Sequence, residues 1–341
     1  MKSFSVPANS SRYFESEVEA IKQPQGIINF VPHPEGYFYN SSFNSSLVKY
    51  DDTYQTENRF HLQKSIGEFN KLASQLSGYR FVEIGCGQGE FIDYLISIGE
   101  SATGYDPVCR VKSAHLNAEF FDIGKIPSSA KKIVFVMRCV LPHIEEPFGF
   151  IDKIFERFPS SLILMQHQRI EHFLKFKSWN ALMHDHVNIF QESDFDEKYN
   201  VLSKSKFAKN EWQQILIARK SKTTTPRSKR SDLLEPLLQS RTSHLEALMK
   251  LEEIYLFGAA GKGINFAYAC IQNRIRISGA IDDQPNIWYK YMDSSGIQVL
   301  PPKEIKKSTL KPSLIVMNHN YLESARKRFS DTFEVHSLVT L

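Results

Sequence analysis

The sequence predicts an α/β protein with two parallel-sheet units, because two glycine-rich turns each follow an apolar segment and precede a helical pattern. The first lies in residues 79–95, where Glu83-Ile-Gly-Cys-Gly-Gln-Gly ends the apolar segment. The second lies in residues 253–268 and contains Phe257-Gly-Ala-Ala-Gly-Lys-Gly. Strands that alternate with helices favour parallel sheets covered by helices. A chain of 341 residues is long enough for two such domains.

The rest of the chain is divided by composition. Residues 1–45 contain Pro, Gly, Ser and aromatic residues without a clear period, which predicts an irregular N-terminal cap. Residues 46–219 form the first predicted unit, 220–250 a linker and a packing helix, and 251–341 the second unit. The basic run at 219–230 favours a solvated linker over a nucleic-acid contact, because no aromatic residues interleave with its charges.

Composition excludes several classes of protein. With 42% hydrophobic and 23% charged residues, the chain is not disordered throughout, and its net charge of +4 is too small to indicate a nucleic-acid-binding protein. No apolar run reaches about 18 residues, so no membrane-spanning helix is expected, and the N-terminus lacks the layout of a signal peptide. Four scattered cysteines without a CxxC pair predict neither disulfides nor a zinc site, and we expect a cytoplasmic protein.

The first glycine turn differs from the dinucleotide-binding fingerprint. The third glycine of Gly85, Gly87 and Gly89 comes one position early, and Glu83 stands before the first. A carboxylate there would repel a pyrophosphate but suits a ligand that carries an amino group. This combination resembles motif I of the class I S-adenosylmethionine-dependent methyltransferases, which implies a Rossmann-like fold and S-adenosylmethionine as the cofactor.

Further cofactor-binding candidates follow the next strands. Asp106 ends the segment 102–106 and is placed to accept hydrogen bonds from two ribose hydroxyls. Phe121 and Asp122 suit the face and the amino edge of an adenine, and Arg138 ends the apolar segment 132–138.

A histidine-rich segment follows at Met183-His-Asp-His-Val-Asn-Ile-Phe. His186 beside Asp185 is a candidate general base near neutral pH, with His184 two positions before it. A metal site is less favoured because no third ligand lies nearby, and we expect no metal. The alternative interpretation is that these residues are polar residues of a surface loop and have no catalytic role.

This segment resembles the Tyr-His-Glu-His-x-Ser-Tyr-Phe motif of the bacterial nucleotide-sugar C-methyltransferases, which methylate C3 of a 4-keto deoxysugar. Tyr50-Asp-Asp-Thr-Tyr and Leu141-Pro-His-Ile-Glu-Glu-Pro are similar to two other segments of that family, and the likeness covers about residues 46–341. It implies His186 as general base, with Asp185, His184 and Tyr54 as further catalytic residues. The implied substrate-binding residues are His143, Gly258, Lys262, Asp282, Asn318 and Tyr321. The implied partner is a nucleotide-linked sugar, with no nucleic acid and no membrane.

Three features depart from that family. Met183 stands at the position of its catalytic tyrosine, Pro142 replaces a glutamate, and no N-terminal zinc-binding cysteine cluster is present because the first cysteine is Cys86. An O- or N-methyltransferase and a non-catalytic module that binds S-adenosylmethionine and a nucleotide therefore remain as alternatives. From its residues alone, the second glycine turn either binds a nucleotide phosphate through backbone N–H groups and Lys262 or closes a packing turn. A nicotinamide-dependent redox role is less favoured.

Overall fold

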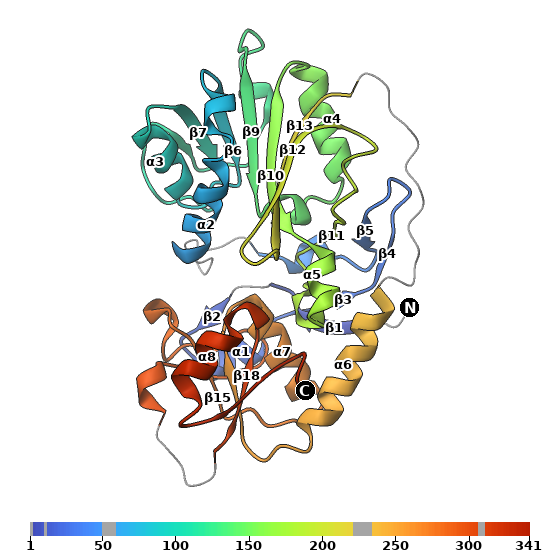
Figure 1. Ribbon diagram of the computed structural model, residues 1–341, viewed down its shortest axis with the longest axis vertical. Coiled ribbons are helices and arrows are strands. Elements are labelled where there is room, and N and C mark those ends of the chain that lie inside the picture. Colours follow the sequence, from blue (N-terminus) through green and yellow to red (C-terminus); the bar gives the residue numbers. More distant parts are fainter. Residues whose placement is uncertain (1–2, 10–11, 50–58, 221–233, 306–310) are drawn as a thin grey trace.

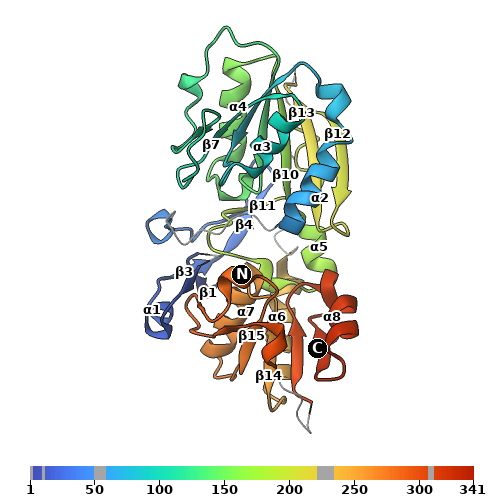
Figure 2. The ribbon, with the colours of Figure 1, turned by 90° about the vertical axis from the view of Figure 1, so that its left-hand side faces the viewer.

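The computed structural model describes residues 3–9, 12–49, 59–220, 234–305 and 311–341. It contains two α/β units, one above the other in Figure 1. The first unit is built on a seven-stranded sheet and the second on a five-stranded sheet. Helix α5 (Ile170–Lys175) and the N-terminal strands lie at the junction of the units (Figures 1 and 2).

The first sheet is parallel except at one edge. In spatial order its strands are β12 (Asn200–Phe207), β13 (Trp212–Ala218), β10 (Leu162–Gln168), β9 (Ile133–Arg138), β6 (Arg80–Ile84), β7 (Ser101–Tyr105) and β8 (Leu116–Asn117). Strands β8, β7, β6, β9 and β10 run parallel, while β13 is antiparallel to both β10 and β12. The carboxyl ends of the parallel strands therefore meet at one edge, which is where open α/β sheets bind ligands.

Helices cover both faces of this sheet. Helices α2 (Arg59–Phe69) and α3 (Glu90–Ser97) share one hydrophobic core with the sheet, and α4 (Pro147–Arg157) shares the other. Along β9, Val134 and Val136 belong to the first core and Phe135 and Met137 to the second. This alternation explains why all six residues of β9 are buried and why the strand is continuously apolar until Arg138.

The second sheet is parallel throughout. Its strands are, in spatial order, β17 (Val299–Leu300), β15 (Gly279–Ile281), β14 (Ile254–Phe257), β18 (Ser313–Val316) and β19 (Glu334–Ser337). Its helices are α6 (Glu235–Leu248), α7 (Gly261–Gln272) and α8 (Leu322–Phe329). Two α/β units are thus confirmed, and α6 is the predicted packing helix, whereas most of the predicted linker lies outside the described residues. No described helix is both long and apolar enough to cross a membrane.

The N-terminal segment differs from the irregular cap that the sequence predicts. It forms β1 (Phe4–Pro7), β2 (Tyr13–Phe14), α1 (Glu17–Ile21), β3 (Gln25–Ile28), β4 (Phe30–Pro32) and β5 (Phe38–Asn40). Strand β2 pairs with β16 (Tyr291–Met292) near the second sheet, while β5 pairs with β11 (Asn188–Ile189), which lies within the histidine segment. Because each of these strands has only two to four residues, the segment shows no local period.

Candidate active site

The first glycine turn connects β6 to α3 through left-handed backbone. Gly85, Gly87 and Gly89 have φ angles of 71°, 57° and 95°, a region that favours glycine. A Cβ atom on Gly85 would lie 2.3 Å from Cγ2 of Val140, whereas a Cβ atom on Gly87 would have no neighbour within 4 Å. The turn therefore packs closely against the segment after β9 and leaves space at Gly87 for a ligand.

Asp106 holds this turn to the end of β7. Its carboxylate accepts hydrogen bonds from the backbone N–H groups of Gly87 and Val108, each at 2.9 Å. Burial raises the pKa of Asp106, and the two backbone hydrogen bonds only partly oppose that effect. Each carboxylate oxygen has a second lone pair, so the side chain remains suited to two ribose hydroxyls.

The predicted adenine-binding residues follow β8. The half-buried ring of Phe121 packs edge-on against Tyr105, with a centroid separation of 5.5 Å. The exposed Asp122 accepts a hydrogen bond from the backbone N–H of Gly124 at 2.8 Å, and it caps the short helix η3 (Ile123–Lys125). Both remain candidates for adenine contacts.

Glu83 and Arg138 form a buried ion pair beneath the turn. Nε of Arg138 donates to Oε1 of Glu83 at 2.7 Å, and the guanidinium lies over the ring of Phe91 at 4.3 Å. Glu83 was expected to meet the amino group of a ligand, but its side chain is fully buried and engaged by Arg138. The reason is energetic, since an unpaired carboxylate in this core would be costly. No local sequence pattern indicates this pairing, because the two residues are 55 positions apart.

Two imidazoles meet near this edge of the sheet. His143 ends the short helix η4 (Leu141–His143) that follows β9, three positions after the Val140 that packs on the glycine turn. Its Nδ1 lies 2.6 Å from the carbonyl oxygen of Asp185, so this nitrogen carries the proton and donates it. The rings of His143 and His186 pack edge-on, with centroids 4.8 Å apart. The structure thus brings together three residues that the sequence singled out.

The environment of His186 disfavours the charged form of its imidazole. Burial lowers the pKa of His186, and His143 lowers it further, while the carboxylate of Asp185 opposes this effect without cancelling it. Desolvation therefore outweighs the carboxylate of Asp185 in setting the direction of this pKa shift. A neutral imidazole still has a free lone pair that can accept a proton.

His184 has a different place from the one expected of a catalytic or metal-binding histidine. Its side chain is fully buried, Nδ1 lies 3.2 Å from the carbonyl oxygen of Ile27, and Nε2 accepts from the backbone N–H of Asn44 at 3.3 Å. A Cβ atom on Gly26 would lie 2.2 Å from the His184 ring. His184 therefore holds the N-terminal segment in place. This structural role replaces the catalytic role that the sequence predicts for His184. Tyr54 lies outside the described residues.

The second unit anchors the histidine segment. Trp179, in the short helix η5 (Trp179–Ala181), is fully buried and stacks on Phe266 of α7 with centroids 5.4 Å apart. The Nδ2 group of Asn265 donates to the carbonyl oxygens of Asn180 and Leu182, at 3.1 and 2.7 Å. The position of His186 therefore depends on α7 as well as on the first sheet.

The second glycine turn repeats the design of the first. Gly258 has a φ angle of 100°, and Asp282 at the end of β15 accepts from the backbone N–H groups of Ala259 and Gln284, at 2.8 and 3.0 Å. A Cβ atom on Gly263 would lie 2.1 Å from the carbonyl oxygen of Gly258, so α7 starts in close contact with the turn. Burial raises the pKa of Asp282, as it does for Asp106.

The sequence predicts that Lys262 and Asn318 bind the substrate, but in the structure both side chains are engaged by another residue of the chain. Both donate to the carboxylate of Glu211, a residue of the first unit just before β13. Burial alone would raise the pKa of Glu211, but the charges of Lys262 and His172 and the hydrogen bonds from Lys262 and Asn318 outweigh it and lower this pKa to about 2. Tyr321 is 40% exposed beside these residues. Sequence reasoning missed Glu211, which lies in a polar hairpin turn without a motif.

Metal binding finds no support in the described part of the chain, where no three His, Cys, Asp or Glu side chains are grouped to hold a metal ion. The glycine turn and Asp106, in contrast, fit an adenosine-containing cofactor.

One protein family matches part of the chain. Residues 56–198 match the model of a methyltransferase domain family. The match includes the first glycine turn, Asp106, His143 and His186. This match, which covers less than half of the 341-residue chain, indicates an S-adenosylmethionine-dependent methyltransferase.

Solved structures show distant likenesses to the methyltransferase. The PH0226 protein from Pyrococcus horikoshii OT3 is 15% identical with a TM-score of 0.38, and the alignment covers 50% of this chain and 95% of that one. Magnesium protoporphyrin IX methyltransferase from Synechocystis PCC 6803 is 14% identical with a TM-score of 0.35, over 50% and 91% of the chains. The methyltransferase domain of a bacterial Hen1 protein is 12% identical with a TM-score of 0.36, over 46% and 98%. At these values the likenesses assign no substrate to the methyltransferase. A search of curated proteins found no match.

Proposed function

We propose that the methyltransferase methylates a carbon atom of a nucleotide-linked 4-keto sugar, and that His186 removes the proton from that carbon. The observation that carries this proposal is the contact between the His143 and His186 rings. His143 lies three positions after Val140, which packs on the first glycine turn. The similarity of residues 183–190 to the motif of the nucleotide-sugar C-methyltransferases supports the sugar substrate.

The chemistry requires a carbon nucleophile. Bound S-adenosylmethionine supplies an electrophilic methyl group on a sulfonium. The neutral imidazole of His186 accepts the acidic proton beside the ketone, which leaves the electron pair in an enolate. Asp185 stabilises the imidazolium that forms, because its carboxylate favours the charged form of His186. His143, whose Nδ1 proton is committed to the carbonyl of Asp185, holds this segment in place.

Labelled S-adenosylmethionine and a panel of nucleotide 4-keto sugars test the proposal. We expect base-stable label on a ring carbon, and we expect His186→Gln to lower turnover by about 100-fold or more while S-adenosylhomocysteine binding is unchanged. His115→Gln is the control, because His115 is an exposed histidine of the same domain. Full turnover by the His186 variant would overturn its assignment as the base.

Methylation of oxygen or nitrogen is the second candidate, and Met183 favours it. This thioether stands where the related motif has a tyrosine, and it has no proton to donate to an enolate oxygen. An oxygen nucleophile needs only general-base help. Label recovered on oxygen or nitrogen would select this candidate. Failure of calorimetry to detect S-adenosylmethionine binding would remove both.

A further inference from the structure

Glu211 crosses from the first unit into the second. It follows a turn between β12 and β13 in which Ala208, Lys209 and Asn210 all have left-handed backbone, with φ angles of 47°, 55° and 66°. Three consecutive residues in this region are unusual for residues other than glycine. The turn presents Glu211 to the second unit, where its side chain is only 6% exposed.

Donors of the second unit converge on this carboxylate. Nζ of Lys262 lies 2.5 Å from Oε1, and the Nδ2 groups of Asn318 and Asn320 each donate to Oε2 at 2.9 Å. Lys262 is the second residue of the 12-residue helix α7, where the unpaired N–H groups of a helix start add positive potential. Asn318 and Asn320 follow β18, so the donors come from two separate strand ends of one sheet.

We infer that Lys262, Asn318 and Asn320 form an oxyanion-binding site on the second unit, and that the Glu211 carboxylate occupies it as an internal ligand. One ammonium and two amide N–H groups around two oxygen atoms match a phosphate group as well as they match a carboxylate. A phosphate or diphosphate group of a substrate would have to displace Glu211. That this anion belongs to a nucleotide-linked sugar rests on the proposed function.

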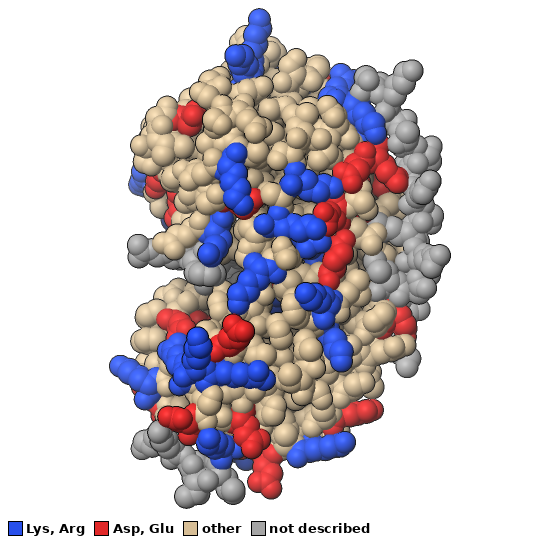
Figure 3. Space-filling view, viewed as in Figure 1, with Lys and Arg blue, Asp and Glu red and all other residues tan. Residues whose placement is uncertain are grey.

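The surrounding charge favours this class of ligand. Figure 3 shows several Lys and Arg side chains on this face where the two units meet, with Asp and Glu side chains among them. Lys209, beside Glu211, also donates to the backbone carbonyl oxygen of Asn320 at 2.6 Å, which adds a second cation to the site. A phosphate carries more negative charge than the single carboxylate that it would replace, so it gains more from these two cations.

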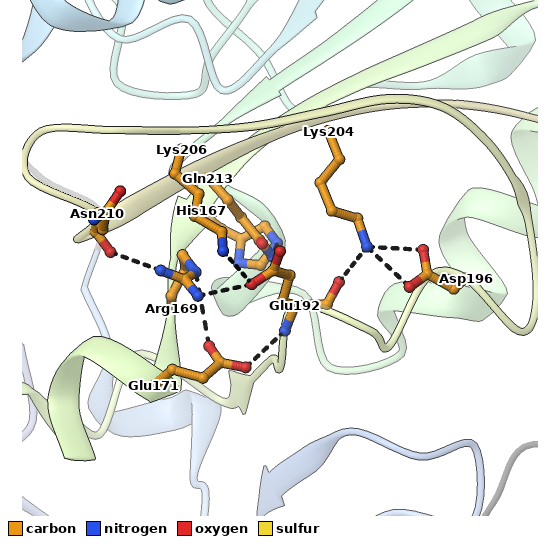
Figure 4. Close-up of polar contacts among 9 residues, drawn as sticks. All are labelled: His167, Arg169, Glu171, Glu192, Asp196, Lys204, Lys206, Asn210 and Gln213. Carbon is orange, nitrogen blue, oxygen red and sulfur yellow. Dashed lines mark hydrogen bonds and ion pairs between the residues drawn. The ribbon is translucent and has the colours of Figure 1, made fainter. Parts of the chain in front are cut away.

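Pyrophosphate titration of Glu211→Gln tests the inference. Glutamine is isosteric but uncharged, so the site should open to an external anion. We expect the variant to bind pyrophosphate at least about tenfold more tightly than the wild type, with an affinity that falls as salt rises. Adding Lys262→Met should abolish the gain. Glu192→Gln is the matched control, because Glu192 is likewise an ion-paired carboxylate near the same hairpin, with Arg169 and Lys206 as its partners, but it is partly exposed (Figure 4).

Several results would overturn the inference. One is a folded Glu211→Gln variant that binds pyrophosphate no more tightly than the wild type. The others are an equal increase in pyrophosphate affinity in Glu192→Gln, or an increase that persists when Lys262→Met is added to Glu211→Gln. If the Glu211→Gln variant does not fold, hydrogen–deuterium exchange of the wild-type protein tests the inference instead. Excess pyrophosphate should increase the exchange rate of the backbone amides of residues 208–212. An unchanged rate would refute displacement of Glu211. None of these readouts needs methyl transfer, so failure of the proposed sugar chemistry would be seen separately.

Discussion

Replacing Glu211 with glutamine should remove a pH-dependent part of the folding free energy. The pKa of Glu211 is about 2 in the folded protein, against an ordinary value of 4.5. Because each pKa unit corresponds to about 1.4 kcal/mol, the ionised carboxylate contributes on the order of 3 kcal/mol of stability. The side chain is buried, so solvent screening reduces this figure little.

The direction of the effect follows from the lowered pKa. The contribution is complete above about pH 4.5, the ordinary value, and is lost as pH falls towards 2. Urea unfolding of wild type and Glu211→Gln at pH 6 and pH 3.5 measures it. Between these values the stability advantage of the wild type should shrink by about 1 kcal/mol, because glutamine does not titrate. An advantage that stays constant over this range would refute the assigned charge state of Glu211.

Three further substitutions test the cofactor site and the N-terminal segment. Gly85→Ala places a Cβ atom in steric conflict at a left-handed position, so affinity for S-adenosylhomocysteine should fall by about tenfold or more in calorimetry, and an unchanged Kd would contradict the close packing of the turn. Asp106→Ala should weaken the same binding by about 10- to 100-fold, whereas undiminished affinity would exclude Asp106 from the cofactor site. Gly26→Ala should lower the melting temperature by several degrees because of the conflict with His184, while Gly67→Ala, with no neighbour within 4 Å, should not.

Local patterns in the sequence predict much of the methyltransferase domain. The apolar run before Glu83, the glycines after it and Asp106 lie within residues 79–106, so strand, turn and ligand-binding carboxylate can be inferred together. The histidine segment is also recognised locally, and the structure places His186 beside His143.

The remaining parts depend on contacts between distant segments. Sequence pattern cannot show that Arg138 neutralises Glu83, because the pairing depends on the order of β6 and β9 in the sheet. Lys262 has the appearance of a phosphate ligand until Glu211, 51 positions earlier, is found against it. His184 and His186 have similar surroundings in the sequence. The close contact between His184 and Gly26 in the folded chain is what shows that His184 has a structural role.

The N-terminal segment has a consequence for biosynthesis. Ser5 hydrogen-bonds to Tyr268, 263 positions later, and Tyr13 donates to the carbonyl oxygen of Ala259. Strands β1 and β2 therefore leave the ribosome long before their partners in the second unit are translated. Until then they expose apolar side chains that the second unit later covers, which favours aggregation of the nascent chain. We expect its yield in cells to depend on chaperones that shield residues 3–40 until translation has passed β16.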